Sequence, residues 1–385
     1  MMLVVPPLLY CCRWETNMGQ SNGNSIGKIS FLQVFMVMML VNGLTSHVIV
    51  NPLLLDASGR DAWISVIMTG FVYVPWCGLL VYIMKKSGRR KLQEWLAERT
   101  SPLVSWLFMI PVFLQLYLIG SMTVTHTAIW TVTNYLPATP QYVLIIMLVL
   151  VCHYAAMNGL RTIAIGAGIL LPTVVGLGIF VAISNTSEKD YNLLRPFLEN
   201  GLQPPVHGMI FAGGAFVEII LLLFVQHRLK NRVRAWQIML LGVVLVYITL
   251  GPIIGAITEF GPKEAAKQMV SPYEQWRLVK LGNYIEHVDF LSVYQWLAGA
   301  SLRISFALFL ISDMLPIRKE KARRWVVLGI SVSLIVVALL TSDQSTFYLW
   351  LFKIYFPLSL LNALVLTAAW AIIALFDKTA KEQPT

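Results

Sequence analysis

The stretch TSPLVSWLFMIPVFLQLYLIGSMTVTHTAIWTVTNYLPATPQYVLIIMLVLVCHYAAMNGL, residues 100–160, contains no Asp, Glu, Lys or Arg. A helix of about 20 apolar residues crosses the hydrocarbon core of a bilayer, so this stretch is long enough for two crossings and the turn between them. Residues 29–55 form a second stretch without these charges. Over the whole chain of 385 residues, 57% are hydrophobic and only 12% are charged, where ~25% is usual in soluble proteins. The sequence therefore predicts an all-α integral membrane protein.

The net charge of +10 belongs, in such a chain, to loops at the membrane surface. The expected partner is therefore the lipid bilayer, and no nucleic acid is expected. Two cysteines, Cys11 and Cys12, lie near the N-terminus, and two others, Cys77 and Cys152, lie within apolar runs. No group among them has metal-ligand spacing, so we expect neither a bound metal nor another cofactor.

Ten charge-poor apolar runs, separated by turn residues, predict ten transmembrane helices. Their expected ranges are 30–50, 62–84, 103–130, 141–157, 162–184, 206–227, 236–257, 290–314, 325–342 and 346–376. The fourth run is short, and the third and tenth are long, which a kink at Pro111 or Pro357 can absorb. In the longest loop we expect a surface helix from Glu264 to Lys280.

The chain divides into one membrane domain, 30–376, and two cytoplasmic tails, 1–29 and 377–385. The apolar run from Leu3 to Tyr10 is too short for a span and follows no basic residue, so a signal peptide is not predicted. Met18 opens the polar segment that leads to the first span, and translation from Met18 is an alternative start.

The distribution of Lys and Arg predicts the orientation in the membrane. With the N-terminus in the cytoplasm, 20 of the 29 Lys and Arg residues fall on the cytoplasmic side and 7 fall outside. Cytoplasmic loops are enriched in these two residue types. We therefore expect both termini in the cytoplasm. The bias also supports ten spans, because one missed span would reverse the side of every later loop.

An even number of spans is consistent with an inverted five-plus-five repeat, in which broken helices at matching positions mark the substrate site. Asn42-Gly43 interrupts the first span, and Gly213-Gly214 interrupts the sixth, which opens the second half. Backbone freed from helical hydrogen bonds is tolerated in a membrane only against protein or a cavity. Close packing on small residues is the alternative explanation for each glycine.

Broken first and sixth helices would direct free N–H groups and the positive end of a helix dipole at a carboxylate. Hydroxyl groups beside a break could add donors to the same ligand. The predicted substrate-binding residues are therefore those around the two breaks: Gly43, Thr45, Ser46, Gly213, Gly214 and Ala215.

Three ionisable side chains lie inside predicted spans: Glu218 in the sixth, Arg303 in the eighth and Lys353 in the tenth. Charges at membrane depth are costly and usually face a cavity or one another. Lys353 is near enough to the end of its span to reach the surface. With a rise of 1.5 Å per residue, Glu218 and Arg303 lie at equal depth, roughly 18–20 Å from the outer face. We predict that they pair, and carbonyl groups at the broken first span are the alternative partner for Arg303.

The other polar residues in the spans are assigned structural roles. His47, His126 and His153 are expected as polar packing groups, and Asp313 as a solvated side chain at a cytoplasmic helix end. No G-x-S-x-G, phosphate-binding loop or H-E-x-x-H motif occurs in the sequence. We therefore do not expect an enzyme.

From about residue 28 to 376 the chain resembles the B subunits of bacterial spore germinant receptors, the GerAB type of endospore germination permease. The most specific likeness is IEHVDFLSVYQWLAGASLRIS, residues 285–305, which is similar to the family's pattern at Glu286, Asp289, Trp296 and Arg303. His287 and Arg303 stand where the family commonly has Arg and Lys. A second stretch, KDYNLLRPFLENG, is similar to the family's Asn–Pro–Gly loop at Asn192, Pro196 and Gly201.

This resemblance implies a fold and a function. The family belongs to the amino acid-polyamine-organocation transporter superfamily, which implies a LeuT/APC-like inverted repeat with broken first and sixth helices. It also implies a germinant-receptor subunit of the spore's inner membrane that works with an A and a C subunit. The ligand would be a small nutrient, most often an amino acid, and Arg303 would take the place of the sodium ion bound in related transporters.

Two other functions remain open at the level of the sequence. A proton- or sodium-coupled amino acid permease is the main alternative, and a structural membrane subunit with a vestigial pocket is the third. The motifs are specific to the family and do not identify a ligand.

Overall fold

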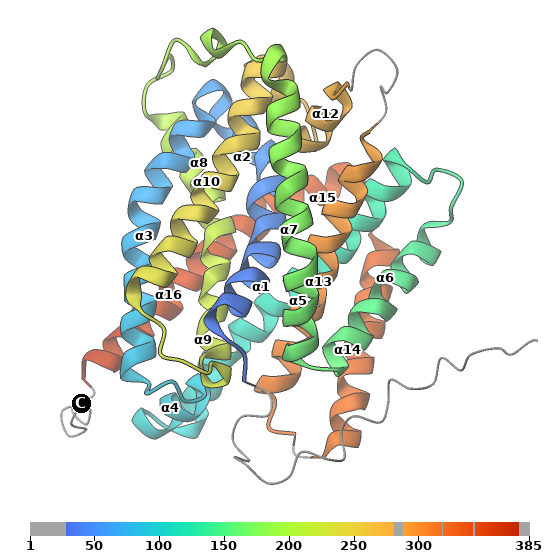
Figure 1. Cartoon of the computed structure of the whole chain (residues 1–385). Helices are drawn as coiled ribbons and strands as arrows, with labels where there is room; N and C mark the ends of the chain where they lie inside the picture. Colours follow the sequence, from blue (N-terminus) through green and yellow to red (C-terminus); the bar gives the residue numbers. More distant parts are fainter. Residues whose placement is uncertain (1–27, 281–287, 318, 342, 377–385) are drawn as a thin grey trace, which may run out of the picture.

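The computed structural model describes residues 28–280, 288–317, 319–341 and 343–376, and within these ranges the regular structure is helical (Figure 1). Nine described helical segments are long and apolar enough to cross a membrane, and α6 (Gln141–Met157) is a shorter apolar helix of 17 residues. The all-α prediction is confirmed, and the predicted count of ten is reached only with α6 included. Of the predicted tails, residues 1–27, which include the alternative start at Met18, and residues 377–385 lie outside the described residues, as do the motif residues Glu286 and His287.

The first half of the membrane domain contains α1 (Phe31–Leu44), α2 (Asn51–Ser58), α3 (Ala62–Lys86), α5 (Pro102–Asn134), α6 and α7 (Leu160–Ser184). The second half contains α8 (Gln203–Phe216), α9 (Leu222–Val225), α10 (Ala235–Phe260), α13 (Phe290–Met314), α14 (Glu320–Leu340), α15 (Gln344–Trp350) and α16 (Phe356–Leu375). The first span is formed by α1 and α2, the sixth by α8 and α9, and the tenth by α15 and α16. Three short helices lie in loops: α4 (Leu92–Arg99), α11 (Pro262–Ala265) and α12 (Ser271–Leu278).

Side chains that cap helix N-termini explain where several spans begin. Ser30 accepts a hydrogen bond from the backbone N–H of Gln33, whose side chain accepts from the N–H of Ser30, which is a capping box at the start of α1. Ser101 caps α5 by accepting a hydrogen bond from the backbone N–H of Val104, with Pro102 at the first helical position. Asp343 caps α15, and its hydrogen bonds from Thr346 hold the pKa of this carboxyl group below its usual value. These caps satisfy backbone donors that a helix end leaves free.

The packing of the helices repeats between the two halves. Corresponding helices lie against each other: α3 packs on α10, α5 on α13, and α6 on α14. The first and fifth spans of each half also pack together, as α1 on α7 and α8 on α16. Figure 1 shows that α1 leads upward to α2, whereas α8 leads downward to α9. The two halves therefore pack their helices in the same way but run through the membrane in opposite directions. This is the predicted inverted five-plus-five repeat.

The largest differences from the predicted boundaries concern the first span, the ninth span and the surface helix. The path of the first span continues beyond residue 50 through α2, after the interruption. The ninth span begins at Glu320 rather than at 325, because Glu320 and Arg324 form an ion pair of 3.6 Å that extends the helix past its apolar part. The predicted surface helix from Glu264 to Lys280 is two helices, α11 and α12, since Pro272 starts a new helix in its first turn.

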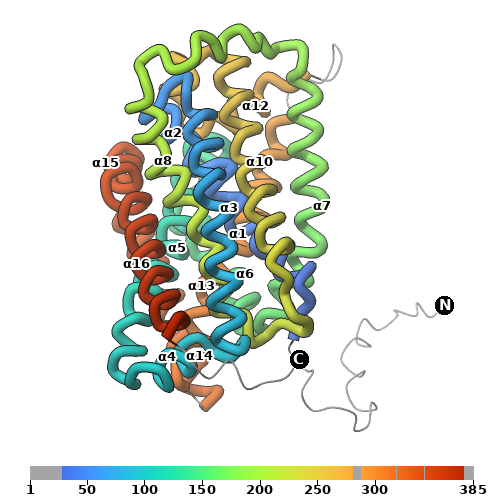
Figure 2. Tube along the Cα trace, turned by 90° about the vertical axis from the view of Figure 1, so that its left-hand side faces the viewer, coloured from blue at the N-terminus to red at the C-terminus, as the bar shows by residue number. Residues whose placement is uncertain are grey.

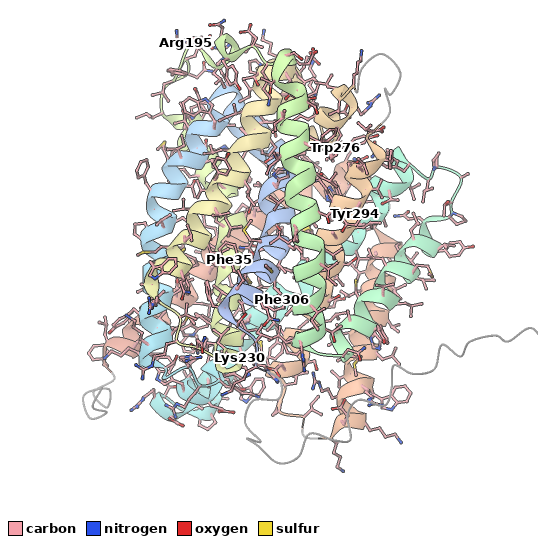
Figure 3. All side chains as sticks on the ribbon, in the orientation of Figure 1. Phe35, Arg195, Lys230, Trp276, Tyr294 and Phe306 are labelled. Atoms are coloured by element: carbon pink, nitrogen blue, oxygen red, sulfur yellow. The ribbon has the colours of Figure 1, made fainter. Side chains whose placement is uncertain are left out.

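The two ends of the molecule are clearly separated. Figure 2 shows α4 at one end and α12 at the other, and Figure 3 places Lys230 at the first end and Arg195 at the second. At the α4 end, Asp313 contradicts its prediction, because it is buried and contacts Arg228 and His227 rather than solvent. The reason is that the backbone after α9 passes next to the end of α13, which the sequence did not reveal.

Candidate functional site

Three spans leave the α-helical conformation along their length. The first contains a π-helical segment, Thr45–Ile49, and the sixth contains a 3-10 segment, Val217–Leu221. Both confirm the predicted breaks, although each begins shortly after the glycines that suggested it. The tenth span contains another π-helical segment, Leu351–Tyr355, which we did not predict. Such departures from α-helical geometry are frequent at functional sites because they redirect side chains.

The break in the tenth span has a local cause. Proline has no backbone N–H, so Pro357 cannot donate to the carbonyl of Lys353 four residues earlier. Instead, the N–H of Phe356 donates to the carbonyl of Leu351, which is the longer ring of a π turn. The sequence indicated a kink at Pro357, and the structure places the resulting π segment directly before it.

The free N–H groups expected at the breaks are engaged in this structure. After the first break, the N–H of Val50 donates to the carbonyl of Thr45 at 2.9 Å, and that of Leu54 to the carbonyl of Val50 at 3.0 Å. At the sixth span, the N–H of Val217 donates to Gly213. These three N–H groups are therefore satisfied within their own spans, as a membrane requires.

Glu218 and Arg303 form a buried ion pair. Glu218 comes from the 3-10 segment of the sixth span and Arg303 from α13, and their exposed fractions are 2% and 0%. Nη2 of Arg303 donates to Oε1 of Glu218 at 2.6 Å, and Nη1 contacts Oε2. The contact is bidentate, which is the strongest geometry for this pair. The pairing that equal depth predicted is therefore present.

Further groups from three other spans complete the arrangement. Nη1 of Arg303 donates to the carbonyl of Val41 at 2.9 Å, and Nε donates to the hydroxyl of Thr123 at 2.9 Å. Glu218 accepts hydrogen bonds from Tyr355 at 3.3 Å and from Thr45 at 3.4 Å. We call these six residues the Glu218–Arg303 cluster: Val41, Thr45, Thr123, Glu218, Arg303 and Tyr355.

The cluster joins the first, third, sixth, eighth and tenth spans at one place, and each of the three interruptions contributes to it or borders it. Of the two partners that the sequence left open for Arg303, both are present: the carboxylate of Glu218 and one carbonyl of the first span, that of Val41. Removing one partner of a buried pair leaves the other charge uncompensated, which typically costs ~3–5 kcal/mol. The arrangement therefore fixes a cation at the first break and couples five helices.

The predicted substrate-binding residues fall into two groups. At the first break, Thr45 belongs to the cluster, and Gly43 and Ser46 lie beside it in sequence. A Cβ atom on Gly43 would come no closer than 3.8 Å to Ile248, so packing alone does not require glycine at this position.

The glycines of the sixth span lie against another helix. A Cβ atom on Gly214 would lie 2.5 Å from the backbone oxygen of Phe356, and one on Gly213 would lie 3.0 Å from Leu360. Both neighbours belong to α16, and Ala215 is also fully buried. Close packing, the alternative explanation from the sequence, therefore accounts for Gly213 and Gly214 in this structure.

A small cavity of about 20 Å³ borders Glu218 between α5, the 3-10 segment and α16. Its polar lining comes from Gln115, Ser359 and Asn362 besides Glu218. This volume accommodates about one water molecule. A nutrient therefore fits into this cavity only if the surrounding helices rearrange.

The three histidines that were predicted as polar packing groups have structural contacts. His47 bonds to the carbonyl of Ile248 at 2.8 Å, His153 to the hydroxyl of Ser331 at 3.0 Å, and the ring of His126 packs on Trp296 and Phe347. Lys353 is exposed, as expected for a side chain that reaches the surface.

The motif residues of the eighth span share one face of α13. Asp289, Trp296 and Arg303 are spaced by seven residues, which places them on the same side of a helix. Each contacts the third span: Tyr135 donates to the carbonyl of Asp289 at 2.7 Å, Trp296 donates to Thr127 at 3.0 Å, and Arg303 donates to Thr123. The motif therefore encodes the contact between α13 and α5, with the cluster at its inner end.

The fold and the buried cluster define a transporter-like membrane protein. A manganese transporter of Eremococcus coleocola has a similar fold, with a TM-score of 0.59 over 93% of this chain and 83% of that chain. The two sequences are 13% identical, so the likeness concerns the fold alone.

Within this class, the chain belongs to the spore germination protein family, whose family model matches residues 28–346. It is 39% identical to spore germination protein XB of Bacillus anthracis over 347 residues, which cover 89% of this chain and 98% of that protein. It is 25% identical to spore germination protein A2 of Bacillus subtilis (strain 168) over 249 residues, 63% of this chain and 67% of that protein. The family membership that the motifs suggested is confirmed.

Proposed function

We propose that this protein is the membrane subunit of a nutrient germinant receptor, which binds a small germinant, an amino acid, and triggers germination of the spore. The observation that supports this most directly is the meeting of interrupted first, sixth and tenth spans at the Glu218–Arg303 cluster. Because the spans share hydrogen bonds, a change in one of them changes the contacts of the others. A ligand bound at one break therefore alters the whole bundle.

The binding site that we propose lies between the first and sixth breaks and uses Gly43, Thr45, Ser46, Gly213, Gly214 and Ala215. Thr45 supports this location because it touches Glu218 across the two spans. The engaged backbone and the small cavity mean that a ligand must displace existing contacts. That requirement suits a receptor, since binding and conformational change then become one event.

We place the protein in the bacterial cell membrane and the inner membrane of the spore, with both termini in the cytoplasm and with A and C subunits as partners. The basic residues support this orientation. The loop 228–234, which contains Lys230 at the α4 end, carries four of them, whereas the loop 185–202, which contains Arg195 at the opposite end, carries two (Figure 3). Membership of the spore germination protein family supports the receptor context.

The test is germination of spores that lack this gene and carry either the wild-type gene or Arg303→Ala. Loss of refractility is followed after addition of single amino acids. We expect a response with the wild-type gene and a much weaker one with the variant. If none of the amino acids triggers germination of spores that carry the wild-type gene, the proposed ligand class is contradicted.

A coupled amino acid permease is the second candidate, favoured by the interrupted first and sixth spans, since transporters with inverted repeats bind their substrates at such interruptions. Vesicles that contain the purified protein distinguish the two functions. Accumulation of labelled amino acid above the level of empty vesicles would favour the permease. Saturable binding without accumulation would favour the receptor.

A further inference from the structure

Arg89, in the loop between α3 and α4, has a partly buried guanidinium group without a carboxylate partner. Three arginines of the described residues, Arg60, Arg89 and Arg228, have a buried Nε atom that makes no hydrogen bond. Arg60 and Arg228 each form an ion pair with a carboxylate. Among the described residues no carboxylate pairs with Arg89, whose Nη2 donates instead to the carbonyl of Leu229 at 2.6 Å. This combination distinguishes Arg89 from the other two arginines.

A second arginine adds positive charge at the same place. Arg232 lies in the loop 228–234 after the sixth span, is exposed, and forms no ion pair with the residues that the structure describes. Burial, and after it the charge of Arg232, lowers the pKa of the Arg89 guanidinium group. Like charges at short distance repel, and an anion bound beside both of them removes this cost. Lys230 and Arg234 of the same loop are exposed as well and add to the uncompensated charge.

The backbone holds Arg89 in this position. Gly88 and Arg89 have φ angles of 61° and 60°, a left-handed conformation that is unfavourable for a residue with a side chain. The loop is also fixed by side chains, since the hydroxyl of Ser87 donates to Gln226 at 3.2 Å and Gln226 donates to the carbonyl of Arg90 at 3.0 Å. Strained residues in a well-held loop are frequent at binding sites. Arg89 is therefore placed by the fold next to the second loop.

The position of both loops relative to the spans indicates where the anion comes from. α10 begins directly after the loop 228–234, and its side chains Trp236, Leu240, Val243 and Tyr247 are exposed along one face. An exposed apolar face of a span contacts lipid, and a tryptophan at its end marks the level of the headgroups. Figure 3 shows Lys230 at this end of the molecule. The uncompensated charges therefore lie where the phosphate groups of the lipids are.

We propose that Arg89 and Arg232 bind the phosphate group of an anionic phospholipid in the leaflet at the α4 end, with Lys230 and Arg234 beside them. An arginine binds phosphate through as many as two parallel N–H groups, and both arginines have donors that no described group accepts from. Phosphatidylglycerol and cardiolipin supply the missing negative charge, whereas phosphatidylcholine compensates its phosphate with its own cation. The inference goes beyond the proposed function and does not depend on the nutrient.

The bound phosphate would act on the connection between the first and sixth spans. The N–H of Ile29 donates to the carbonyl of Arg228, and the N–H of Lys230 donates to the carbonyl of Ile29, both at 2.9 Å. Leu229, which lies between these two residues, accepts from Arg89. A phosphate that fixes Arg89 also fixes this connection, so an anionic lipid should stabilise the folded protein.

Thermal melting of the purified, delipidated full-length protein in detergent tests the proposal. Phosphatidylglycerol should raise the melting temperature of the wild type, and phosphatidylcholine or inorganic phosphate should not. Arg232→Gln changes an exposed side chain, so its melting temperature without lipid should equal that of the wild type. Its half-maximal rise should require roughly tenfold more phosphatidylglycerol, as expected for the loss of one charge-assisted hydrogen bond. Arg89→Gln should lose the rise and also melt earlier without lipid, because its bond to Leu229 is lost.

Arg161→Gln is the matched control. Arg161 is exposed in the first turn of α7, which begins at the α4 end (Figure 1), and it forms no ion pair with the described residues. The substitution removes the same charge, so the response to phosphatidylglycerol should stay that of the wild type. An equal loss in Arg161→Gln would show that surface charge in general attracts the lipid, and the assignment to Arg89 and Arg232 would be wrong.

The remaining outcomes also decide the inference. An unchanged requirement for phosphatidylglycerol in Arg232→Gln would overturn the site. An equal rise of the wild type with inorganic phosphate would make it a site for free phosphate, and an equal rise with phosphatidylcholine would remove the preference for anionic lipid. If phosphatidylglycerol does not stabilise the wild type, the proposal is wrong, and an acidic segment of a protein partner is then the candidate for these charges.

Discussion

Arg303 shows how much one residue contributes to this fold. Its guanidinium group bonds to Glu218, to the carbonyl of Val41 and to the hydroxyl of Thr123, which belong to three different spans. A lysine has the same charge but only one nitrogen, so it cannot reproduce the bidentate contact and the two other bonds together. Arg303→Lys should therefore be milder than Arg303→Ala and still weaker than the wild type in abundance and response.

The ion pair itself is tested by a double substitution. Glu218→Gln and Arg303→Gln should each lower stability by ~3–5 kcal/mol, because each leaves an uncompensated buried charge. Together they remove both charges, so the double variant should recover part of the loss. Thermal melting of the four proteins measures this coupling. Simple additivity would show that the pair does not act as a unit.

Tyr355 is a smaller test of the same cluster. Its hydroxyl donates to Glu218 at 3.3 Å and accepts from Arg303 at 3.5 Å. Tyr355→Phe should cost ~1 kcal/mol of stability, as is usual for a lost hydrogen bond. Tyr247→Phe is the control, since Tyr247 is 74% exposed on α10 and should melt like the wild type. If the two variants have the same melting temperature, the hydroxyl of Tyr355 does not stabilise the cluster.

At the scale of elements, the sequence predicted the spans well and the contacts between them only in part. The absence of charge reveals a span directly, and the rise per residue gives depth, which is why Glu218 and Arg303 could be paired. Thr123 and Tyr355 gave no signal, because a hydroxyl on an apolar helix is common and the face of a helix depends on its neighbours. Asp313 was misjudged for the same reason, since its partner Arg228 comes from another segment.

The close packing of α8 on α16 at Gly214 can be tested by substitution. A Cβ atom there would lie 2.5 Å from a backbone oxygen, which cannot move aside as a flexible side chain can. Gly214→Ala should therefore destabilise the protein by ~1–3 kcal/mol, as overpacking usually does. The effect is measured as a lower melting temperature and weaker nutrient response.

Gly176→Ala is the control for this substitution, because a Cβ atom on Gly176 of α7 meets nothing within 4 Å. It should be tolerated or slightly stabilising in a helix. A normal melting temperature and response for Gly214→Ala would show that α8 and α16 separate easily, and the contact would then carry no structural constraint.

At the scale of the whole molecule, the cluster is the place where the two halves of the repeat meet. Val41, Thr45 and Thr123 come from the first half, and Glu218, Arg303 and Tyr355 from the second. The apolar runs and the interruptions of the first and sixth spans could be predicted, because they depend on composition and on glycine, whereas the π segment of the tenth span was not predicted. The way in which the halves pack, α3 on α10 and α5 on α13, depends on side-chain shape along whole helices and was not predicted.

The orientation of the molecule gives the last prediction. Single cysteines at positions 232 and 267 are introduced into a protein in which Cys11, Cys12, Cys77 and Cys152 are replaced. Arg232 follows α9 in the loop that contains Lys230, at the α4 end, and Lys267 lies between α11 and α12, at the opposite end (Figure 2). Because basic loops remain in the cytoplasm, an impermeant thiol reagent added outside intact cells should label position 267 and leave 232 unlabelled. After permeabilisation, position 232 should be labelled as well, which shows that its thiol is accessible. Labelling of 232 alone in intact cells would reverse the orientation, and with it the side from which a nutrient reaches the first break.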